Sequence, residues 1–205
     1  MRILVVAATA LEIPVLQSHA RHGHEIEVLI TGVGMVATAA RCAQTLALTS
    51  FDLAFNFGVC GTFDRSIEPG TVVHVTSDCV AELGAEDGDR FVSMFELRLV
   101  KDSDIVNVSP PANPVLAALP RVKGITVNTV HGDPPSIARV VSRCDPQVES
   151  MEGAAFAYAC AISSVPYAQV RAVSNVVERR NRDAWRMELA IRNLNDVALR
   201  ILEQA

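Results

Sequence analysis

The sequence predicts an α/β fold: a single domain over residues 1–205, built as a three-layer sandwich around a central mixed, mainly parallel β-sheet. Short apolar runs of strand length alternate with helical patterns along the chain. This alternation is typical of a parallel sheet that helices cover on both faces. The length of 205 residues suits one large domain, and no repeat, low-complexity segment or linker interrupts the pattern.

The first half of the chain contains four runs that favour strands and two patterns that favour helices. Residues 3–8 form an apolar run of the kind found in buried strands. Residues 71–77 are rich in β-branched side chains, which strands also favour. The elements expected here are strands at 2–7, 25–31, 53–58 and 71–77, and helices at 10–18 and 36–48.

The second half begins with an irregular stretch, residues 80–113, which holds short strand-like pieces and the turn-forming pair Pro110 and Pro111. Beyond it, helical spacing of apolar residues alternates again with strand patterns. The elements expected here are strands at 122–131 and 167–173, and helices at 136–143, 152–163 and 184–203.

Charge and cysteine content exclude several classes of function. The chain carries 18 Lys and Arg against 23 Asp and Glu, a net charge of −5, and no basic run of five or more. It therefore lacks the basic surface that binds nucleic acid or an anionic membrane. Its five cysteines are widely spaced without a CxxC pair, so neither a disulfide framework nor a metal site is expected. Reduced thiols fit a cytoplasmic protein.

Two uncharged stretches have better explanations than a membrane segment. The apolar run at residues 3–8 is short and is followed at once by Glu12 and Pro14, which favours a buried strand over a signal peptide. Residues 153–170 contain Pro166 and several polar side chains, so a buried helix, a turn and a core strand explain them better than a membrane span.

The turn at residues 31–34 offers one alternative function. Gly32, Gly34 and Ala37 match the dinucleotide-binding pattern G-x-G-x-x-G/A, which would make the protein an NAD-dependent oxidoreductase. The pattern follows the second expected strand rather than the first, however, and no acidic residue ends the next strand. The two glycines otherwise serve a tight turn and close packing of a helix on a strand.

In such sheets, ligands bind beyond the carboxyl ends of the strands. This rule selects the segments that should form the candidate site. They are residues 8–12, 31–34, 56–61, 128–132, 148–151 and 174–175.

Four of these regions match a known signature. Residues 151–155 (MEGAA) resemble the M-E-x-A-A signature of the nucleoside phosphorylase/nucleosidase superfamily, and residues 57–61 resemble its G-x-A-G turn. Residues 171–175 resemble its R-A-[IV]-S-[DN] strand end, and residues 31–34 its second turn, all in the superfamily's order. The resemblance implies the phosphorylase/hydrolase-like fold and cleavage of a nucleoside at its N-glycosidic bond.

Within the superfamily, the chain resembles the futalosine hydrolase family. The stretches that carry this resemblance are residues 9–12, 126–132, 149–156 and 174–185. It implies hydrolysis of futalosine to hypoxanthine and dehypoxanthine futalosine, in menaquinone biosynthesis. It also implies a homodimer or homotetramer that binds a small nucleoside, needs no cofactor or metal, and binds neither nucleic acid nor a membrane.

Three residues are expected to act on the glycosidic bond, whose hydrolysis passes through an oxocarbenium-like cation. By resemblance, Glu152 binds the ribose hydroxyls and Glu12 activates the attacking water. The anion site of the phosphorylases is missing, and the Glu12 carboxylate would repel phosphate, which favours hydrolysis over phosphorolysis. Arg171 lies inside an apolar strand; a buried guanidinium needs a partner, so we expect a carboxylate there, near Glu12 by resemblance.

Asn175 indicates the base. Hydrolases of the superfamily that act on adenine nucleosides carry aspartate at this position, which donates a proton to the purine N7. Asparagine is no acid, but its NH2 group can donate a hydrogen bond to N7 or O6 of a 6-oxopurine. The substitution therefore favours a hypoxanthine nucleoside.

The remaining expected contacts concern the sugar and the 5′ group. By resemblance, Met151 packs beneath the sugar, and the segment from Arg179 to Trp185 lies near the 5′ end. The carboxyphenyl ketone of futalosine lies at that end, so Arg180 or Arg182 would pair with its carboxylate and Trp185 would cover its ring. The other residues expected to bind substrate are Gly58, Thr129 and His131.

Three alternatives remain open. The first is another purine nucleosidase, of the methylthioadenosine/S-adenosylhomocysteine type, or a purine nucleoside phosphorylase. The second is the NAD-dependent oxidoreductase, and the third is a non-catalytic nucleoside-binding module. Each role also has a structural alternative: a helix-start carboxylate for Glu12 and Glu152, an ion pair for Arg171, and a loop cap for Asn175.

Overall fold

The computed structural model describes residues 1–16, 23–102 and 104–205. The strands of the main sheet are β1 (Arg2–Ala7), β2 (Glu25–Ile30), β3 (Leu53–Thr62), β4 (Val72–Asp78), β7 (Ile105–Val106), β8 (Arg121–Thr126), β9 (Val148–Ser150) and β10 (Tyr167–Val176). A separate hairpin is formed by β5 (Gly84–Asp87) and β6 (Arg90–Ser93). The helices are α1 (Met35–Leu48), α2 (Pro114–Ala117), α3 (Pro134–Cys144), α4 (Gly153–Ile162), the 3-10 helix η1 (Arg182–Ala184) and α5 (Met187–Glu203).

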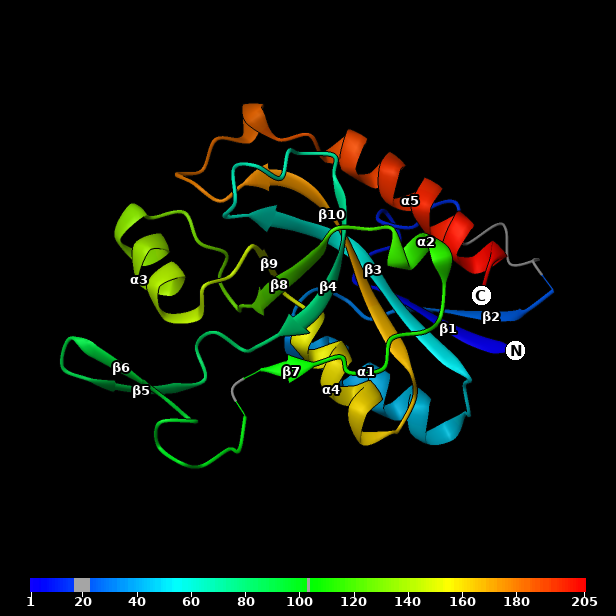
Figure 1. Ribbon diagram of the computed structural model, residues 1–205, viewed down its shortest axis with the longest axis horizontal. Helices are drawn as coiled ribbons and strands as arrows, with labels where there is room; N and C mark the ends of the chain where they lie inside the picture. Colours follow the sequence, from blue (N-terminus) through cyan, green and yellow to red (C-terminus); the bar gives the residue numbers. More distant parts are fainter. Residues whose placement is uncertain (17–22, 103) are drawn as a thin grey trace.

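The strands form one mixed sheet with helices on both faces. The order is β10-β4-β8-β9-β3-β1-β2, with β7 added to β4. Helices α1 and α4 pack together on one side, and α5 packs against β10 and β3 on the other (Figure 1). The predicted α/β fold with a mixed, mainly parallel sheet and flanking helices is therefore confirmed.

The long strand β3 organises the site end of the sheet. Up to Asn56 it pairs in parallel with β1, and at Gly61 and Thr62 it pairs antiparallel with β9. Its other edge pairs with β10, which continues through β4 and β8 to β9, so five strands close a ring. Between Asn56 and Gly61, no described strand pairs with β3 on the β1 side. The sheet therefore opens beyond the carboxyl end of β1, where ligands bind in such folds.

Burial on both faces explains the unbroken apolar run of β1. Val5 packs into a fully buried cluster that includes Leu194 of α5, whereas its neighbour Leu4 packs into a second cluster that includes Phe156 of α4. Successive side chains of a strand point to opposite faces, so a strand between two helical layers is apolar throughout. In the described part of the chain, no helix is both long and apolar enough to span a bilayer.

The helix predicted at residues 10–18 is wrong over its described part. Residues 10–16 form turns, in which the Glu12 N–H donates to the Thr9 carbonyl, three residues back, at 3.3 Å. Pro14 has no N–H to continue an α-helical ladder. Residues 17 and 18 lie outside the described residues.

Several predicted turns are strands. Residues 56–61 lie within β3 and residues 174–175 within β10, while β9 takes up most of residues 148–151. In the segment 56–61, Gly58 and Gly61 favour the prediction of a turn, but a strand accepts Gly where another group approaches its backbone closely.

Two element boundaries also differ from the prediction. The strand predicted at 122–131 ends at Thr126, and the chain then runs irregularly to α3. The terminal helix begins at Met187 rather than 184, after the short η1 and an extended Trp185. The sequence did not indicate α2 or β9 as elements, while β5, β6 and β7 lie in the stretch 80–113, where short strand-like pieces were expected.

Candidate functional site

The turn after β1 holds the Glu12 carboxylate by backbone donors. The Thr9 N–H donates to Oε2 at 2.9 Å, and the Thr9 hydroxyl donates to the same oxygen at 3.2 Å. The Val59 N–H donates to Oε1 at 3.2 Å. Val59 lies in the stretch of β3 that β1 and β9 leave unpaired, so the opening of the sheet supplies this donor. The carboxylate is thereby fixed at the carboxyl end of β1.

Gly58 leaves room for two charged groups. A Cβ added there would lie 2.6 Å from Nη1 of Arg171 and 3.1 Å from Oε1 of Glu12. The guanidinium and the carboxylate therefore approach the same glycine, from β10 and from the turn after β1. The structure brings together Glu12, Gly58 and Arg171, as the sequence predicted.

The partner of Arg171 differs from the prediction. Arg171 is 1% exposed, and its Nη2 donates to the side-chain oxygen of Asn56 on β3. Among the residues that the structure describes, Arg171 has no carboxylate within ion-pair distance, and its Nε has no hydrogen-bond partner. An amide oxygen satisfies part of the buried guanidinium without neutralising it, so the positive charge remains at the site.

Glu152 lies at the start of α4 without capping it. As the N-cap residue it makes no side-chain hydrogen bond to its own helix. Its Oε1 instead accepts a hydrogen bond from the Gly34 N–H at 2.9 Å, and the residue is 8% exposed. Gly34 has φ 97°, a conformation that glycine adopts at little cost. The glycine turn after β2 thus supplies a backbone donor to the Glu152 carboxylate.

Asn175 follows an irregularity in the pairing of β10 with β3, between Val173 and Asn175. The Ser174 hydroxyl donates to the Asn175 Oδ1 at 2.7 Å, and the Asn175 Nδ2 donates to the Val176 carbonyl at 2.9 Å. One of the two Nδ2 hydrogens remains available for another acceptor. The side chain is half-buried, so a ligand can reach it.

A cavity of about 200 Å³ joins several of the expected substrate contacts. Its lining includes four predicted residues, namely His131, Asn175, Arg180 and Trp185. The guanidinium carbon of Arg180 lies 5.3 Å from the centroid of the Trp185 ring, a cation–π contact. Gly61 also lines this cavity, and it follows Gly58 by three residues on β3, about 10 Å along the strand.

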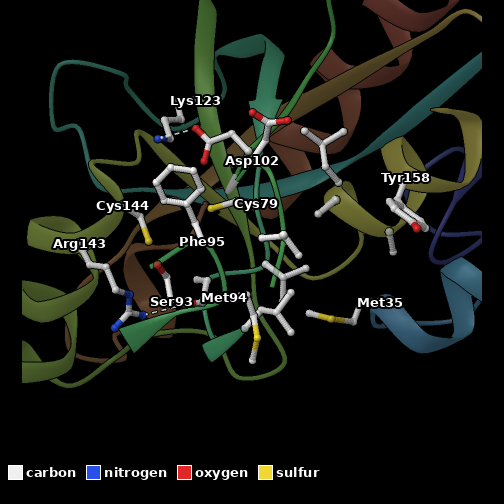
Figure 2. A pocket seen from close by; sticks show the side chains of 18 of the residues that line it. Met35, Cys79, Ser93, Met94, Phe95, Asp102, Lys123, Arg143, Cys144 and Tyr158 are labelled. Carbon is white, nitrogen blue, oxygen red and sulfur yellow. Dashed lines mark hydrogen bonds and ion pairs between the residues drawn. The ribbon is translucent and has the colours of Figure 1, made fainter. Parts of the chain in front are cut away.

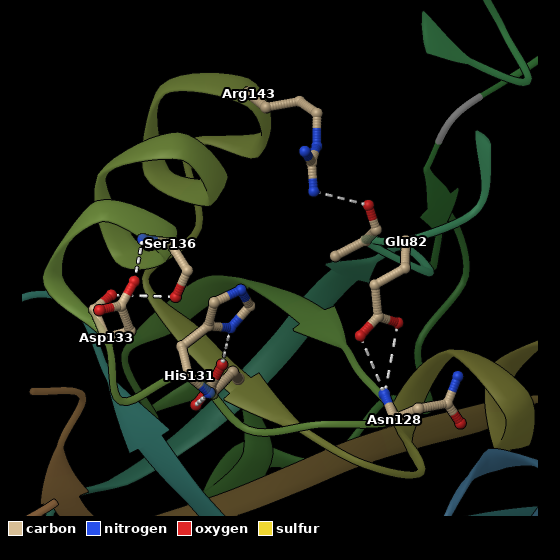
Figure 3. Close-up of polar contacts among 8 residues, drawn as sticks. Glu82, Asn128, His131, Asp133, Ser136 and Arg143 are labelled. Atoms are coloured by element: carbon tan, nitrogen blue, oxygen red, sulfur yellow. Dashed lines mark hydrogen bonds and ion pairs between the residues drawn. The ribbon is translucent and has the colours of Figure 1, made fainter. Parts of the chain in front are cut away.

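His131 is held by a buried carboxylate. Its Nδ1 lies 2.7 Å from Oε2 of Glu149, and its N–H donates to Oε1 of the same residue at 3.0 Å. The segment from β8 to α3 is further fixed by Glu82, which accepts from the Asn128 N–H, and by Asp133, which caps α3 through the Ser136 N–H (Figure 3). Residues 130–132 of this segment form one wall of the cavity.

Three predicted contacts lie elsewhere. Thr129 and Arg182 are exposed and do not line the 200 Å³ cavity, and the half-buried Met151 does not line it either. Cys60 is buried beside the site, and burial raises the pKa of its thiol to about 12, which agrees with a packing role. In the described ranges, no group of three or more His, Cys, Asp or Glu side chains is arranged to hold a metal ion.

A second cavity, of about 770 Å³, lies beside α1 and α4 and contains none of the predicted site residues. Met35 and Tyr158 line it from these helices, and Phe95 and Cys79 lie across it (Figure 2). Apolar side chains such as Val36, Leu83 and Phe91 contribute to its lining.

Asn56 and Glu149 belong to the site, yet the sequence did not single them out. Each is a polar residue, 1% and 4% exposed respectively, within a buried strand. An unexplained polar side chain inside an apolar run was the available signal, since such groups need a partner when buried.

Comparison with known proteins identifies the family of this chain. The family model of the Phosphorylase superfamily matches residues 10–203. A futalosine hydrolase of Streptomyces coelicolor is 32% identical over 182 residues, which cover 83% of this chain and 75% of the relative. A futalosine hydrolase of Thermus thermophilus is 28% identical, with 98% of this chain and 95% of the relative covered.

Solved structures share the fold. The futalosine hydrolase of Helicobacter pylori has a TM-score of 0.83 at 14% identity, covering 99% of this chain and 97% of the other. A methylthioadenosine/S-adenosylhomocysteine nucleosidase of Streptococcus pneumoniae, in complex with 8-aminoadenine, has a TM-score of 0.82 at 17% identity and covers 100% of both chains. The sequence comparisons and the fold together establish that this chain belongs to the phosphorylase superfamily and, within it, to the futalosine hydrolase family.

Proposed function

We propose that this protein is a nucleosidase that hydrolyses futalosine to hypoxanthine and dehypoxanthine futalosine. The observation that carries the proposal is the 32% identity with a futalosine hydrolase over most of the chain. The bond broken joins C1′ of the ribose to the purine nitrogen, and water supplies the new C1′–O bond. Its proton must reach a base, while the electron pair of the broken bond stays with hypoxanthine.

Glu12 is the proposed base for the water. Its carboxylate is fixed by Thr9 and Val59, and Nη1 of Arg171 approaches the same glycine. A fixed carboxylate can accept the proton as the water attacks the ribosyl cation. The guanidinium offers donors that orient the water oxygen.

Glu152 is proposed to act on the ribose, and Asn175 on the purine base. Glu152 accepts hydrogen bonds from the ribose hydroxyls, and its negative charge favours the cationic transition state. The Asn175 Nδ2 donates one hydrogen to the Val176 carbonyl, and its second hydrogen is the proposed donor to N7 or O6 of hypoxanthine. The oxidoreductase alternative would place a pyrophosphate at the Gly34 N–H. This N–H binds the Glu152 carboxylate instead, and the negative charge of the carboxylate would repel a pyrophosphate.

For the 5′ group we propose Arg180 and Trp185. Both line the 200 Å³ cavity with Asn175, whereas Arg182 does not. The carboxylate of the carboxyphenyl group would pair with the Arg180 guanidinium, and its ring would lie against the Trp185 indole. His131, which lines the same cavity, is a further proposed contact, and Met151, Gly58 and Thr129, which do not line it, are proposed to contact the substrate outside it.

An assay with a panel of nucleosides tests the function. Futalosine, inosine and methylthioadenosine are incubated with the protein, with and without phosphate, and the released base is measured by chromatography. We expect futalosine to release hypoxanthine fastest and phosphate to have no effect. Faster cleavage of methylthioadenosine would contradict the role of Asn175, and a requirement for phosphate would contradict that of Glu12.

We further propose that the protein forms a homodimer or a homotetramer through the face formed by α1 and α4. Val36 and Tyr158 on these helices are 78% and 59% exposed, and both line the apolar cavity of 770 Å³. Apolar patches of this kind mark interfaces. Light scattering should give a mass of two or four chains, and Val36→Glu should lower it to that of one chain. A monomeric wild type would overturn the proposal.

A cytoplasmic location is also proposed. The five cysteines are free in the structure, as in a reducing compartment. Cell fractionation with an antiserum against the protein would test it, and recovery outside the cytoplasm would contradict it.

A further inference from the structure

The N–H groups in the first turn of α4 bind side chains other than that of Glu152, the N-cap residue of the helix. The first N–H groups of a helix have no acceptor within the helix and need one from outside. The Gly153 N–H donates to the Ser150 hydroxyl at 3.3 Å, and the Ala154 N–H donates to the hydroxyl of Thr126 on β8 at 2.7 Å. Glu152, the N-cap residue, makes no side-chain bond to this helix, and its carboxylate accepts from the Gly34 N–H instead.

Thr126 is oriented by a buried acidic residue. Its hydroxyl hydrogen goes to Oδ1 of Asp78 at 2.9 Å, which leaves its oxygen free to accept from Ala154. Oδ2 of Asp78 accepts from Nε2 of Gln169 at 2.9 Å. The three side chains come from β8, β4 and β10, and each is 2% exposed or less. Side chains of β10, β4 and β8 thus fix the hydroxyl of Thr126, which accepts a hydrogen bond from the first turn of α4.

The helix packs directly on this network. A Cβ added at Gly153 would overlap Oδ2 of Asp78 and the side-chain amide of Gln169. Burial raises the pKa of Asp78 to about 7, against the opposing effects of the Thr126 hydrogen bond and the Arg171 charge. A buried carboxylate without an ion pair is costly, which argues that its placement serves the site.

We propose that Thr126 and Asp78 are positioning residues: they cap α4 in place of Glu152, so that the Glu152 carboxylate stays free for the ribose hydroxyls. The inference rests on the proposed ribose contact of Glu152. Without the Thr126 hydroxyl, the Ala154 N–H would lack its acceptor and would compete for the carboxylate two residues before it. Glu152 would then turn from the Gly34 N–H towards the Ala154 N–H, because a buried donor without an acceptor is costly.

The test compares two substitutions of Thr126. Thr126→Val keeps the shape and removes the hydroxyl, and we expect kcat to fall about 10-fold with a smaller change in KM. Thr126→Ser keeps the hydroxyl and should restore kcat to within about 2-fold of the wild type. An unchanged kcat for Thr126→Val would overturn the proposal, as would an equal loss in both variants.

A double-mutant cycle separates positioning from a general loss of structure. If Thr126 acts through Glu152, Thr126→Val should lower kcat by less than about 2-fold in a Glu152→Gln background. A full and additive loss would mean that Thr126 acts on structure alone. Should Thr126→Val fail to fold, Asp78→Leu is the second variant: it removes the acceptor together with the buried charge and should lower kcat in the same way.

The cycle uses whichever nucleoside of the panel is cleaved fastest, because every member carries the same 2′- and 3′-hydroxyls on its ribose. The assay with the nucleoside panel therefore tests whether futalosine is the substrate. The double-mutant cycle separately tests whether Thr126 positions Glu152.

Discussion

Glu12→Gln is expected to lower kcat by about 10²–10⁴-fold with little change in KM, since general base catalysis contributes an effect of this size. Glutamine keeps the shape of the side chain but cannot accept the proton of the water. The N–H groups of Thr9 and Val59 each donate to one oxygen of the carboxylate. In glutamine an NH2 group replaces one of these oxygens and would face one of these two donors. Steady-state kinetics with futalosine would measure the loss.

A matched control is Glu68→Gln, a neutral substitution of an exposed glutamate. It should keep wild-type kcat, which would exclude an effect of net charge alone. If Glu12→Gln retained more than about a tenth of the wild-type kcat, another group must activate the water, and the proposed role of Glu12 would be wrong.

The candidate residues Glu12, Glu152 and Asn175 came from resemblance to the family's motifs and from the rule that ligands bind beyond the carboxyl ends of the strands. In the structure they follow or end three separate strands, β1, β9 and β10, of which β9 was not indicated by the sequence. The position of a residue within each motif then indicates which side chain is expected to act on the substrate.

The partners of these residues could not be predicted, because they depend on how distant strands pair. Arg171 was expected beside a carboxylate, but its partner is Asn56, on a strand 115 positions earlier in the chain. The pairing of β3 with β10 sets this neighbour, and the register of two strands so far apart leaves no local signal. The same holds for His131, whose carboxylate Glu149 is brought by β9, a strand too short to be indicated by its sequence.

The helix predicted at residues 10–18 failed for a different reason. Local spacing favoured a helix, but Glu12 uses its side chain to fix the turn through Thr9 and Val59. A turn of this kind places the carboxylate at the opening of the sheet. The strongest departure from local preference thus coincides with a proposed catalytic residue, as is common at functional sites.

Glu152→Gln is expected to lower kcat/KM by about 10²–10³-fold, because it removes the charge that favours the ribosyl cation and weakens the acceptor of two hydroxyl groups. Its effect on stability should be small. Since Ser150 and Thr126, rather than Glu152, cap α4, the melting temperature should change by no more than about 3 °C. Kinetics and calorimetry on the same sample would separate the two quantities.

A 2′-deoxy analogue of the substrate provides the control for this substitution. The analogue lacks one of the hydroxyls that Glu152 is proposed to bind, so the variant should lose less on the analogue than on the ribonucleoside. An equal loss on both would mean that Glu152 acts on something other than that hydroxyl. A large fall in melting temperature would instead assign Glu152 to the helix, and the capping by Thr126 would then be insufficient to free its carboxylate.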